Sequence, residues 1–258
     1  MKKLWVVLTA FFLVMALLSP GAYAKSDHAK KSLVALGDSI TYGSGLGVNG
    51  KDPNKQAFPH LIGDAMDLRV RNLGVPGMTS GELLEAVKSD KTYRDAIRHA
   101  DYITLNIGGN DLLNVLKAAN YNPSGIDPLL LQAAIGSMTR NLNQTIIEIR
   151  SLSDAPVAVY NIYNPIKSQA INTYKYVHVL FSVGNELFGV NGINTYIHDV
   201  VVANHWAFGD VYFADAFGRF AGLVNSGATP LLPGDNVHPN QMGHQELAKA
   251  GITAFDLD

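Results

Sequence analysis

Cysteine is absent from all 258 residues of this chain. This absence excludes disulfide bonds, a cysteine nucleophile, a thiolate metal site and a lipid anchor carried on cysteine. A strong excess of one charge is also absent, because 20 basic residues face 22 acidic ones. The composition therefore gives no electrostatic reason to expect nucleic acid or an anionic membrane as a partner.

An apolar run long enough to cross a membrane is lacking too. The run Leu4–Leu18 is shorter than the roughly 20 residues that a spanning helix needs. Lys2 and Lys3 before it, and Ala22-Tyr23-Ala24 after it, are typical of a secretory signal peptide and its cleavage site. We therefore expect a cleaved signal over residues 1–24, secretion and no stable membrane insertion, the alternative being an uncleaved anchor.

The expected mature chain, residues 25–258, has no repeat, no low-complexity stretch and no block of like charges. Removing Lys2 and Lys3 leaves 18 basic and 22 acidic residues, a formal net charge of −4. Its 234 residues suit one α/β domain with a sizeable core.

Short runs rich in β-branched residues alternate with longer helical patterns. This alternation predicts a three-layer α/β/α fold with a parallel sheet of about five strands. The expected strands are 32–38, 68–75, 101–111, 155–165 and 210–217, and the expected helices are 58–66, 80–89, 128–152, 192–206 and 239–255, the last opening with Pro239 in its first turn.

Unusual polar residues mark the ends of three expected strands: Gly37-Asp38-Ser39, Gly74 and Gly108-Gly109-Asn110-Asp111. Ligands of open parallel sheets bind beyond the carboxyl ends of the strands. We therefore expect these three groups to meet at one edge of the sheet. Ser39 is then a candidate nucleophile, although Gly, Asp and Ser are also ordinary turn residues.

A serine nucleophile needs a base, an orienting carboxylate and donors for the oxyanion. Asp235 lies three residues before His238, a spacing that lets the carboxylate fold back onto the imidazole. Asn110 offers an amide to an oxyanion, and a glycine N–H near Gly74 or Gly77 offers a second donor. Each residue has an ordinary alternative, namely a solvated loop histidine, a turn aspartate, a turn asparagine or a tight strand-to-helix turn.

Taken in order, these segments resemble the four sequence blocks of the SGNH (GDSL-type) hydrolase family. They are Gly37–Gly43, the segment around Gly74, Gly108–Asp111 and Asp235–Pro239, with Ile40 where the family usually has leucine. The resemblance implies a single SGNH hydrolase domain with a flavodoxin-like fold. It also implies Ser39 as nucleophile, His238 as base, Asp235 as orienting carboxylate, and the Ser39 N–H, Gly74 N–H and Asn110 as oxyanion donors, without metal or cofactor.

Other motifs carry less weight. Gly45–Gly50 matches the dinucleotide pattern G-x-G-x-x-G but begins too late after the strand and precedes no apolar helix. His244 falls on the last expected helix, without a metal-ligand spacing to His238.

The substrate stays open. The aromatic and aliphatic stretch 166–191 is either a cap over an acyl pocket or a core helix, and 112–126 is equally ambiguous. A cap would favour a small or lipid-like ester and a lipase or carboxylesterase. An open cleft would favour an O-acetyl esterase of cell-wall or plant polysaccharide, and the non-enzyme alternative is an inactive binding domain.

Overall fold

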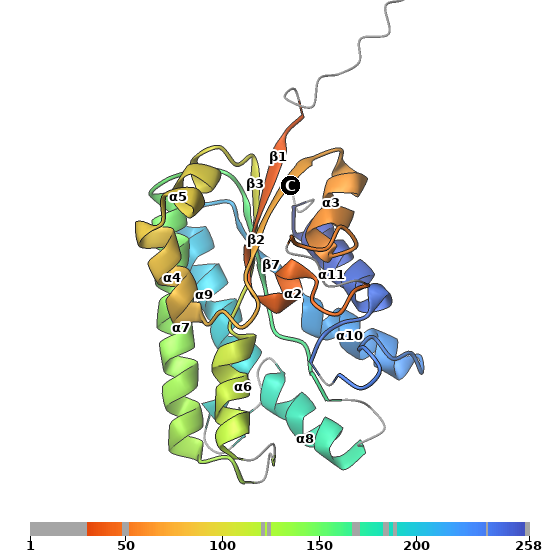
Figure 1. The fold of residues 1–258 in the computed structure, drawn as a ribbon. Helices are drawn as coiled ribbons and strands as arrows, with labels where there is room; N and C mark the ends of the chain where they lie inside the picture. Colours follow the sequence, from red (N-terminus) through yellow and green to blue (C-terminus); the bar gives the residue numbers. More distant parts are fainter. Residues whose placement is uncertain are drawn as a thin grey trace, which may run out of the picture. The chain divides into compact units, whose positions relative to one another are not determined.

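Five parallel strands form the central sheet of the computed structural model (Figure 1). Their order is β2-β1-β3-β4-β7, which is the flavodoxin-like order once the short hairpin between β4 and β7 is set aside. Their bounds are Ser32–Gly37 for β1, Arg69–Gly74 for β2, Tyr102–Asn106 for β3, Val157–Tyr160 for β4 and Val211–Ala214 for β7. The three-layer fold and the five strands expected from the sequence are confirmed.

The structure describes residues 30–47, 52–119, 122, 125–166, 171–182, 186–187, 190–235 and 237–255. These belong to one compact unit, Lys31–Asp258. The expected signal peptide, residues 1–24, lies outside the described residues.

Helices cover both faces of the sheet, as Figure 1 shows. On one face lie α4 (Ser80–Ser89), α5 (Lys91–Arg98), α7 (Pro128–Arg150) and α9 (Ile193–Phe208); on the other lie α3 (Phe58–Met66), α10 (Ala216–Asn225) and α11 (Gln241–Phe255). Strand β4 shows why both faces are covered. Val157 and Val159 belong to the first core, whereas Ala158 and Tyr160 belong to the second, as the alternation of side chains along a strand requires.

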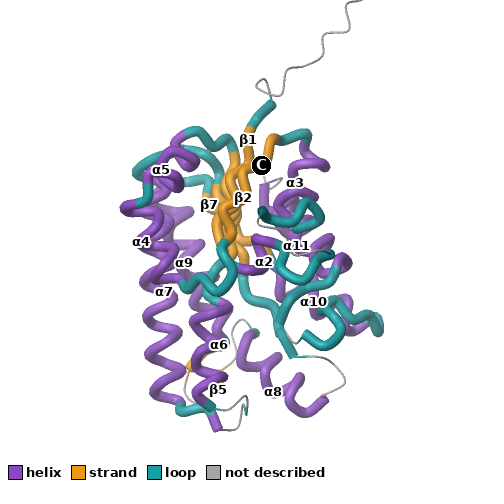
Figure 2. Tube along the Cα trace, in the orientation of Figure 1, coloured by secondary structure: helices purple, strands orange, loops and turns teal. Residues whose placement is uncertain are grey.

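Three helices lie where the strands end rather than against the faces of the sheet. They are α2 (Ser39–Tyr42), α6 (Gly109–Ala118) and α8 (Ile171–Phe181), and Figure 2 shows α6 and α8 beyond the carboxyl ends of the strands. A short antiparallel hairpin follows α8, formed by β5 (Glu186–Leu187) and β6 (Val190–Asn191).

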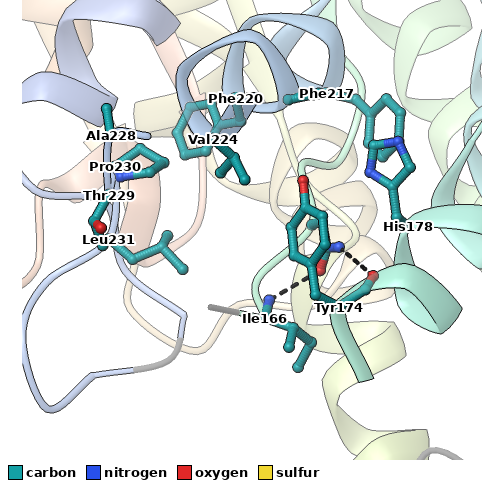
Figure 3. A pocket seen from close by; sticks show the side chains of 12 residues that line it. Ile166, Tyr174, His178, Phe217, Phe220, Val224, Ala228, Thr229, Pro230 and Leu231 are labelled. Atoms are coloured by element: carbon teal, nitrogen blue, oxygen red, sulfur yellow. Dashed lines mark hydrogen bonds between the residues drawn. The ribbon is translucent and has the colours of Figure 1, made fainter. Parts of the chain in front are cut away.

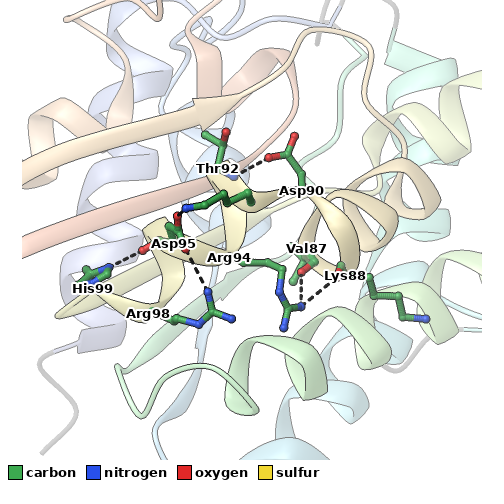
Figure 4. A network of polar contacts seen from close by, with 9 residues as sticks. Val87, Lys88, Asp90, Thr92, Arg94, Asp95, Arg98 and His99 are labelled. Atoms are coloured by element: carbon green, nitrogen blue, oxygen red, sulfur yellow. Dashed lines mark hydrogen bonds and ion pairs between the residues drawn. The ribbon is translucent and has the colours of Figure 1, made fainter.

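A polar network fixes the joint between α4 and α5 (Figure 4). The Asp90 carboxylate accepts the Thr92 N–H at 2.6 Å and caps α5. Arg94 donates to the carbonyl oxygens of Val87 and Lys88, at 3.1 and 3.0 Å, at the end of α4. The carbonyls left unpaired at a helix end are thereby satisfied, and the two helices meet at a defined angle.

The register aligns the ends of three strands. Gly37 is paired with Gly74 on one side and with Asn106 on the other. The predicted meeting of these segments at one edge of the sheet is therefore confirmed. Helices α2, α5 and α10 were not among the elements expected from the sequence. Helices α6 and α8 overlap 112–126 and 166–191, for which a core helix was one of two expectations, but the start of α6 at Gly109 was not expected.

The last helix begins later than expected. Helix α11 starts at Gln241 rather than at Pro239, so the prediction of Pro239 in its first turn is wrong. Pro239 instead forms an isolated antiparallel bridge with Leu231, flanked by hydrogen bonds from the Leu232 N–H to the His238 carbonyl oxygen and from the Asn240 N–H to the Pro230 carbonyl oxygen. The proline closes a loop and does not open a helix.

Candidate active site

Ser39 is the first residue of α2, directly after β1. The Asp38 carboxylate caps this short helix by accepting the Ile40 N–H at 2.9 Å. The preceding turn requires glycine, because a Cβ on Gly37 would lie 2.2 Å from the Asn106 carbonyl oxygen. Ser39 is thus held at the end of the central strand, with 8% of its surface exposed.

His238 and Asp235 lie opposite Ser39 on one loop. The His238 Nε2 is 2.9 Å from the Ser39 Oγ, and its Nδ1 is 2.6 Å from an Asp235 oxygen. A carboxylate on Nδ1 favours the tautomer with the proton there, which leaves Nε2 free to accept the Ser39 hydroxyl proton. The structure therefore brings together the three residues expected from the sequence.

The surroundings of Asp235 favour the ionised form of its carboxyl group. Burial raises its pKa, but hydrogen bonds from the His238 side chain and from the N–H groups of His238 and Val237 outweigh burial, so the pKa falls below its ordinary value. The two N–H groups lie 3.0 and 2.8 Å from Asp235 Oδ1. An ionised carboxylate at this place stabilises a protonated imidazole.

The loop that carries these residues is itself held on both sides. The Leu232 N–H donates to the His238 carbonyl oxygen at 3.0 Å, beside the bridge between Leu231 and Pro239. The Tyr163 hydroxyl donates to the Val237 carbonyl oxygen at 2.6 Å from the sheet side. Sequence reasoning missed Tyr163, since nothing in its local pattern marks it as a support of this loop.

Asn110 lies on the first turn of α6 and not on a glycine turn as expected. Its Nδ2 donates to the Met78 carbonyl oxygen at 2.9 Å and lies 3.3 Å from Asp38 Oδ2. The amide donor group is thus beside the turn between β2 and α4 and beside the capping carboxylate of α2.

Gly74 lines the cleft that contains His238, and its N–H has a partner within the protein. The N–H donates to the Asn72 Oδ1 at 2.9 Å, and Gly74 packs so closely on α2 that a Cβ would lie 2.5 Å from the Tyr42 nitrogen. Gly77, the other glycine of this segment, directly precedes Met78, whose carbonyl oxygen meets Asn110. The turn that contains Gly77 therefore lies against the amide of Asn110.

Asp111 connects this turn to α6. Its two oxygens accept the N–H and the hydroxyl of Ser80 at 2.9 and 2.6 Å, and the Asn141 amide donates to the same hydroxyl at 3.0 Å. Ser80 begins α4, so the contact fixes the start of that helix beside Asn110. The sequence places Asp111 next to Asn110 but gives no sign of this partner.

Asp38 is a buried acid next to the site, with 3% of its surface exposed. Burial raises its pKa to about 7, and the negative charge of Asp111 adds to this rise. The hydrogen bond from the Ile40 N–H and the charge of His238 lower the pKa but do not outweigh burial. A carboxyl group with this pKa is protonated in a large share of molecules at neutral pH.

An apolar pocket opens beside Ser39. It lies between α6, α8 and the beginnings of α7 and α9. Leu112 and Val115 of α6 and Leu180 and Phe181 of α8 line it. A second, open cleft contains His238, Asp235, Tyr42 and Tyr93.

The sequence profile of the GDSL-like lipase/acylhydrolase family matches residues 35–246. The chain belongs to this family. This GDSL hydrolase also shares 28% identity over 228 residues with the uncharacterized protein YpmR of Bacillus subtilis, covering 84% of this chain and 78% of that protein. Membership supports ester hydrolysis as the activity.

Solved structures share the fold of the GDSL hydrolase. A lipase from a goat rumen metagenome has a TM-score of 0.64 at 20% identity, over 87% of this chain and 97% of the other. An extracellular lipase of Streptomyces rimosus has a TM-score of 0.62 at 20% identity, over 87% and 99%. An acetylxylan esterase of Geobacillus stearothermophilus has a TM-score of 0.59 at 16% identity, over 88% and 95%.

Helix α8 of the GDSL hydrolase forms a wall between two cavities. Leu180 and Phe181 face the apolar pocket, whereas Tyr174 and His178 line a smaller cavity against α10 (Figure 3). The His178 ring stacks on Phe217 of α10 at 4.6 Å between centroids. The described part of 166–191 therefore covers the apolar pocket, while residues 167–170, 183–185 and 188–189 of that segment lie outside the described residues.

The remaining motifs of the GDSL hydrolase are structural in the described part. His244 lies on α11 as predicted, is fully buried, and accepts the Phe58 N–H on Nδ1 at 3.2 Å. Burial lowers its pKa to about 3, so the ring is neutral. Gly45 and Gly47 belong to the loop after α2, and 48–50 of that motif lie outside the described residues.

Among the described residues, no group of three or more histidines and carboxylates is arranged to hold a metal ion. None of the described helices combines the length and the apolar character needed to cross a membrane.

Proposed function

We propose that this chain is a secreted serine hydrolase of carboxylic esters that works through an acyl-enzyme intermediate. The observation that carries the proposal is the continuous hydrogen-bond chain from Ser39 Oγ through His238 to the Asp235 carboxylate. The three roles are nucleophile, general base and orienting carboxylate. Secretion rests on the signal-like residues 1–24, and residues 25–258 are proposed to be a single domain.

The proposed reaction begins when Ser39 Oγ attacks the ester carbonyl carbon while His238 Nε2 accepts its proton. The tetrahedral intermediate collapses, and the protonated His238 returns this proton to the departing alkoxide. Water, deprotonated by His238, then attacks the acyl-enzyme carbonyl and forms a second tetrahedral intermediate. This intermediate breaks its bond to Ser39 Oγ, which takes the proton back from His238, and the acid is released. Asp235 holds the imidazole and stabilises its charged form in both halves of the reaction.

The oxyanion that forms in each half needs preorganised donors. We propose the Ser39 N–H and the Asn110 amide for this role. The Gly74 N–H is proposed as the third donor, because Gly74 lines the cleft that contains His238. Its N–H donates to Asn72 Oδ1, and the Asn110 amide donates to Met78 and Asp38, so both would exchange these partners for the oxyanion.

The two cavities indicate where the parts of an ester lie. Asn110 belongs to the apolar pocket, whereas His238 belongs to the open cleft. Since His238 must protonate the leaving alkoxide, the alcohol is proposed to lie in the cleft and the acyl group in the pocket. The apolar lining of this pocket favours a lipase or carboxylesterase over an O-acetyl esterase of polysaccharide.

The test is hydrolysis of p-nitrophenyl esters by the purified chain and by Ser39→Ala, with labelling by a fluorophosphonate. We expect ester hydrolysis and a covalent label in the wild type, and a loss of at least about 10³-fold with no label in the variant. Ser89→Ala, at the exposed end of α4, is the matched control. Wild-type rates in a folded Ser39→Ala protein would refute the assignment, and N-terminal sequencing of protein from the medium tests the proposed cleavage after Ala24.

A further inference from the structure

We propose that helix α6 sets the length of the acyl chain that the enzyme accepts, and that esters of medium-chain fatty acids, about eight to ten carbons long, are its substrates. This inference rests on the proposed function, because it places the acyl group of the ester in the apolar pocket beside Ser39. It adds a substrate class and residues that select it.

The pocket follows α6 along its axis. Its lining includes Asn110, Leu112, Val115 and Leu116, which span two turns of this helix. An α-helix rises 1.5 Å per residue, so the wall from Asn110 to Leu116 is about 9 Å long. An extended alkyl chain advances about 1.3 Å for every carbon–carbon bond, so this wall matches about seven bonds of an acyl chain that starts at the carbonyl carbon, which is the length of an octanoyl group.

Polar and apolar lining groups are separated along this path. The polar members Asp38, Ser39, Asn106, Asn110 and Asn161 lie at the ends of strands β1, β3 and β4 or on the first turn of α6. They surround the place where the ester carbonyl would be. Beyond this mouth the lining residues are apolar. A hydroxylated or charged acyl chain would leave its polar groups without partners there.

The deeper walls are well-buried side chains. Val177, Leu180 and Phe181 of α8 are 5%, 3% and 7% exposed, and Leu131 of α7 and Ile193 of α9 are 2% and 0% exposed. Packed side chains of this kind resist displacement. Chains that reach beyond Leu116 must therefore displace packed groups, so the fit worsens with each further carbon.

The expected dependence on chain length follows from burial. Each methylene that is fully removed from water contributes about fourfold in an equilibrium or rate ratio. We therefore expect kcat/KM to rise at least about tenfold from acetyl to octanoyl p-nitrophenyl esters, to be highest near octanoyl or decanoyl, and to fall for tetradecanoyl and longer chains.

The decisive variants change the wall of α6. Val115 is 5% exposed and lies about 7.5 Å along the helix from Asn110, so Val115→Phe should fill the far part of the pocket. We expect its octanoyl-to-butanoyl ratio of kcat/KM to fall at least about tenfold relative to wild type. Leu116→Ala should raise the dodecanoyl-to-octanoyl ratio by about fourfold or more. Each ratio is measured within one protein, so a loss of folded enzyme cancels.

Asn114→Phe is the matched control, because Asn114 lies on the same helix, is exposed and does not line the pocket. Its ratios should equal those of wild type. Serine-dependent activity that is highest on acetyl esters, or a Val115→Phe protein with wild-type ratios, would overturn the inference and leave the proposed function standing. No hydrolysis of any ester and no fluorophosphonate label would overturn both.

Discussion

Asp38 provides a test of how the site couples to folding. Its carboxyl group is buried at the start of α2, and burial raises its pKa from 3.8 to about 7. Between about pH 4 and about pH 7 the folded protein keeps a proton on Asp38 that the unfolded chain has released. Stability therefore falls as the pH rises through this window and is constant, with respect to this group, above pH 7.

The size of the effect follows from the shift. About three pKa units at 1.36 kcal/mol each give about 4 kcal/mol between the two ends of the window. The substitution Asp38→Asn removes the titration but keeps an oxygen that accepts the Ile40 N–H. The stability of Asp38→Asn relative to wild type should therefore increase by up to about 4 kcal/mol from pH 4 to pH 8.

Urea unfolding of both proteins, followed by circular dichroism at four pH values across this range, measures the difference. Asp154→Asn, which replaces an exposed acid, serves as control and should show no such trend. A stability difference between Asp38→Asn and wild type that stays constant with pH would refute the reasoning, because it would mean that folding leaves the titration of Asp38 unchanged.

Four further substitutions test the supports of the site. Asp111→Ala removes two hydrogen bonds to the start of α4. Urea unfolding should show a loss of about 2–3 kcal/mol of unfolding free energy. Steady-state kinetics should show a lower kcat with little change in KM. Tyr163→Phe removes a hydroxyl that supports the histidine loop and should cost about 1 kcal/mol, with a lower kcat; unchanged kinetics would mean that this hydroxyl has no positioning role. Gly74→Ala should prevent folding or cost more than about 2 kcal/mol of unfolding free energy. The Cβ of Gly77→Ala would have no atom within 4 Å, so this variant should cost about 1 kcal/mol through its backbone angle alone. Equal thermal unfolding midpoints of the two variants would contradict this contrast.

Much of the fold could be predicted because strands and helices have different hydrophobic periods. The runs 58–66 and 80–89 have the bounds of α3 and α4. Helix α6 was missed because Gly108 and Gly109 are typical of a turn, whereas here Gly108 caps the helix with a φ of 111°. Pro239 was misassigned because a proline suits a first helical turn as well as a bridge, and only the returning chain at Leu231 decides between them.

The residues proposed to act on the substrate could be predicted from the sequence, but the contacts that support them could not. Ser39, Asp235 and His238 stand out by local motif, since the capping turn and the three-residue spacing are local. The partner of the Gly74 N–H depends on the rotamer of Asn72, and the apolar pocket depends on how α6 and α8 pack. Such tertiary arrangements leave no short pattern in a single sequence.

The short loop between Leu231 and Pro239 carries both the histidine and its carboxylate, while the serine begins α2 directly after the central strand β1. Surface loops in general open at a lower free-energy cost than core strands and the turns attached to them. Opening of this loop would move His238 and Asp235 away from Ser39 and inactivate the enzyme while its hydrophobic core stayed intact. On gentle heating, turnover should therefore fade reversibly at temperatures where the circular dichroism spectrum is still native.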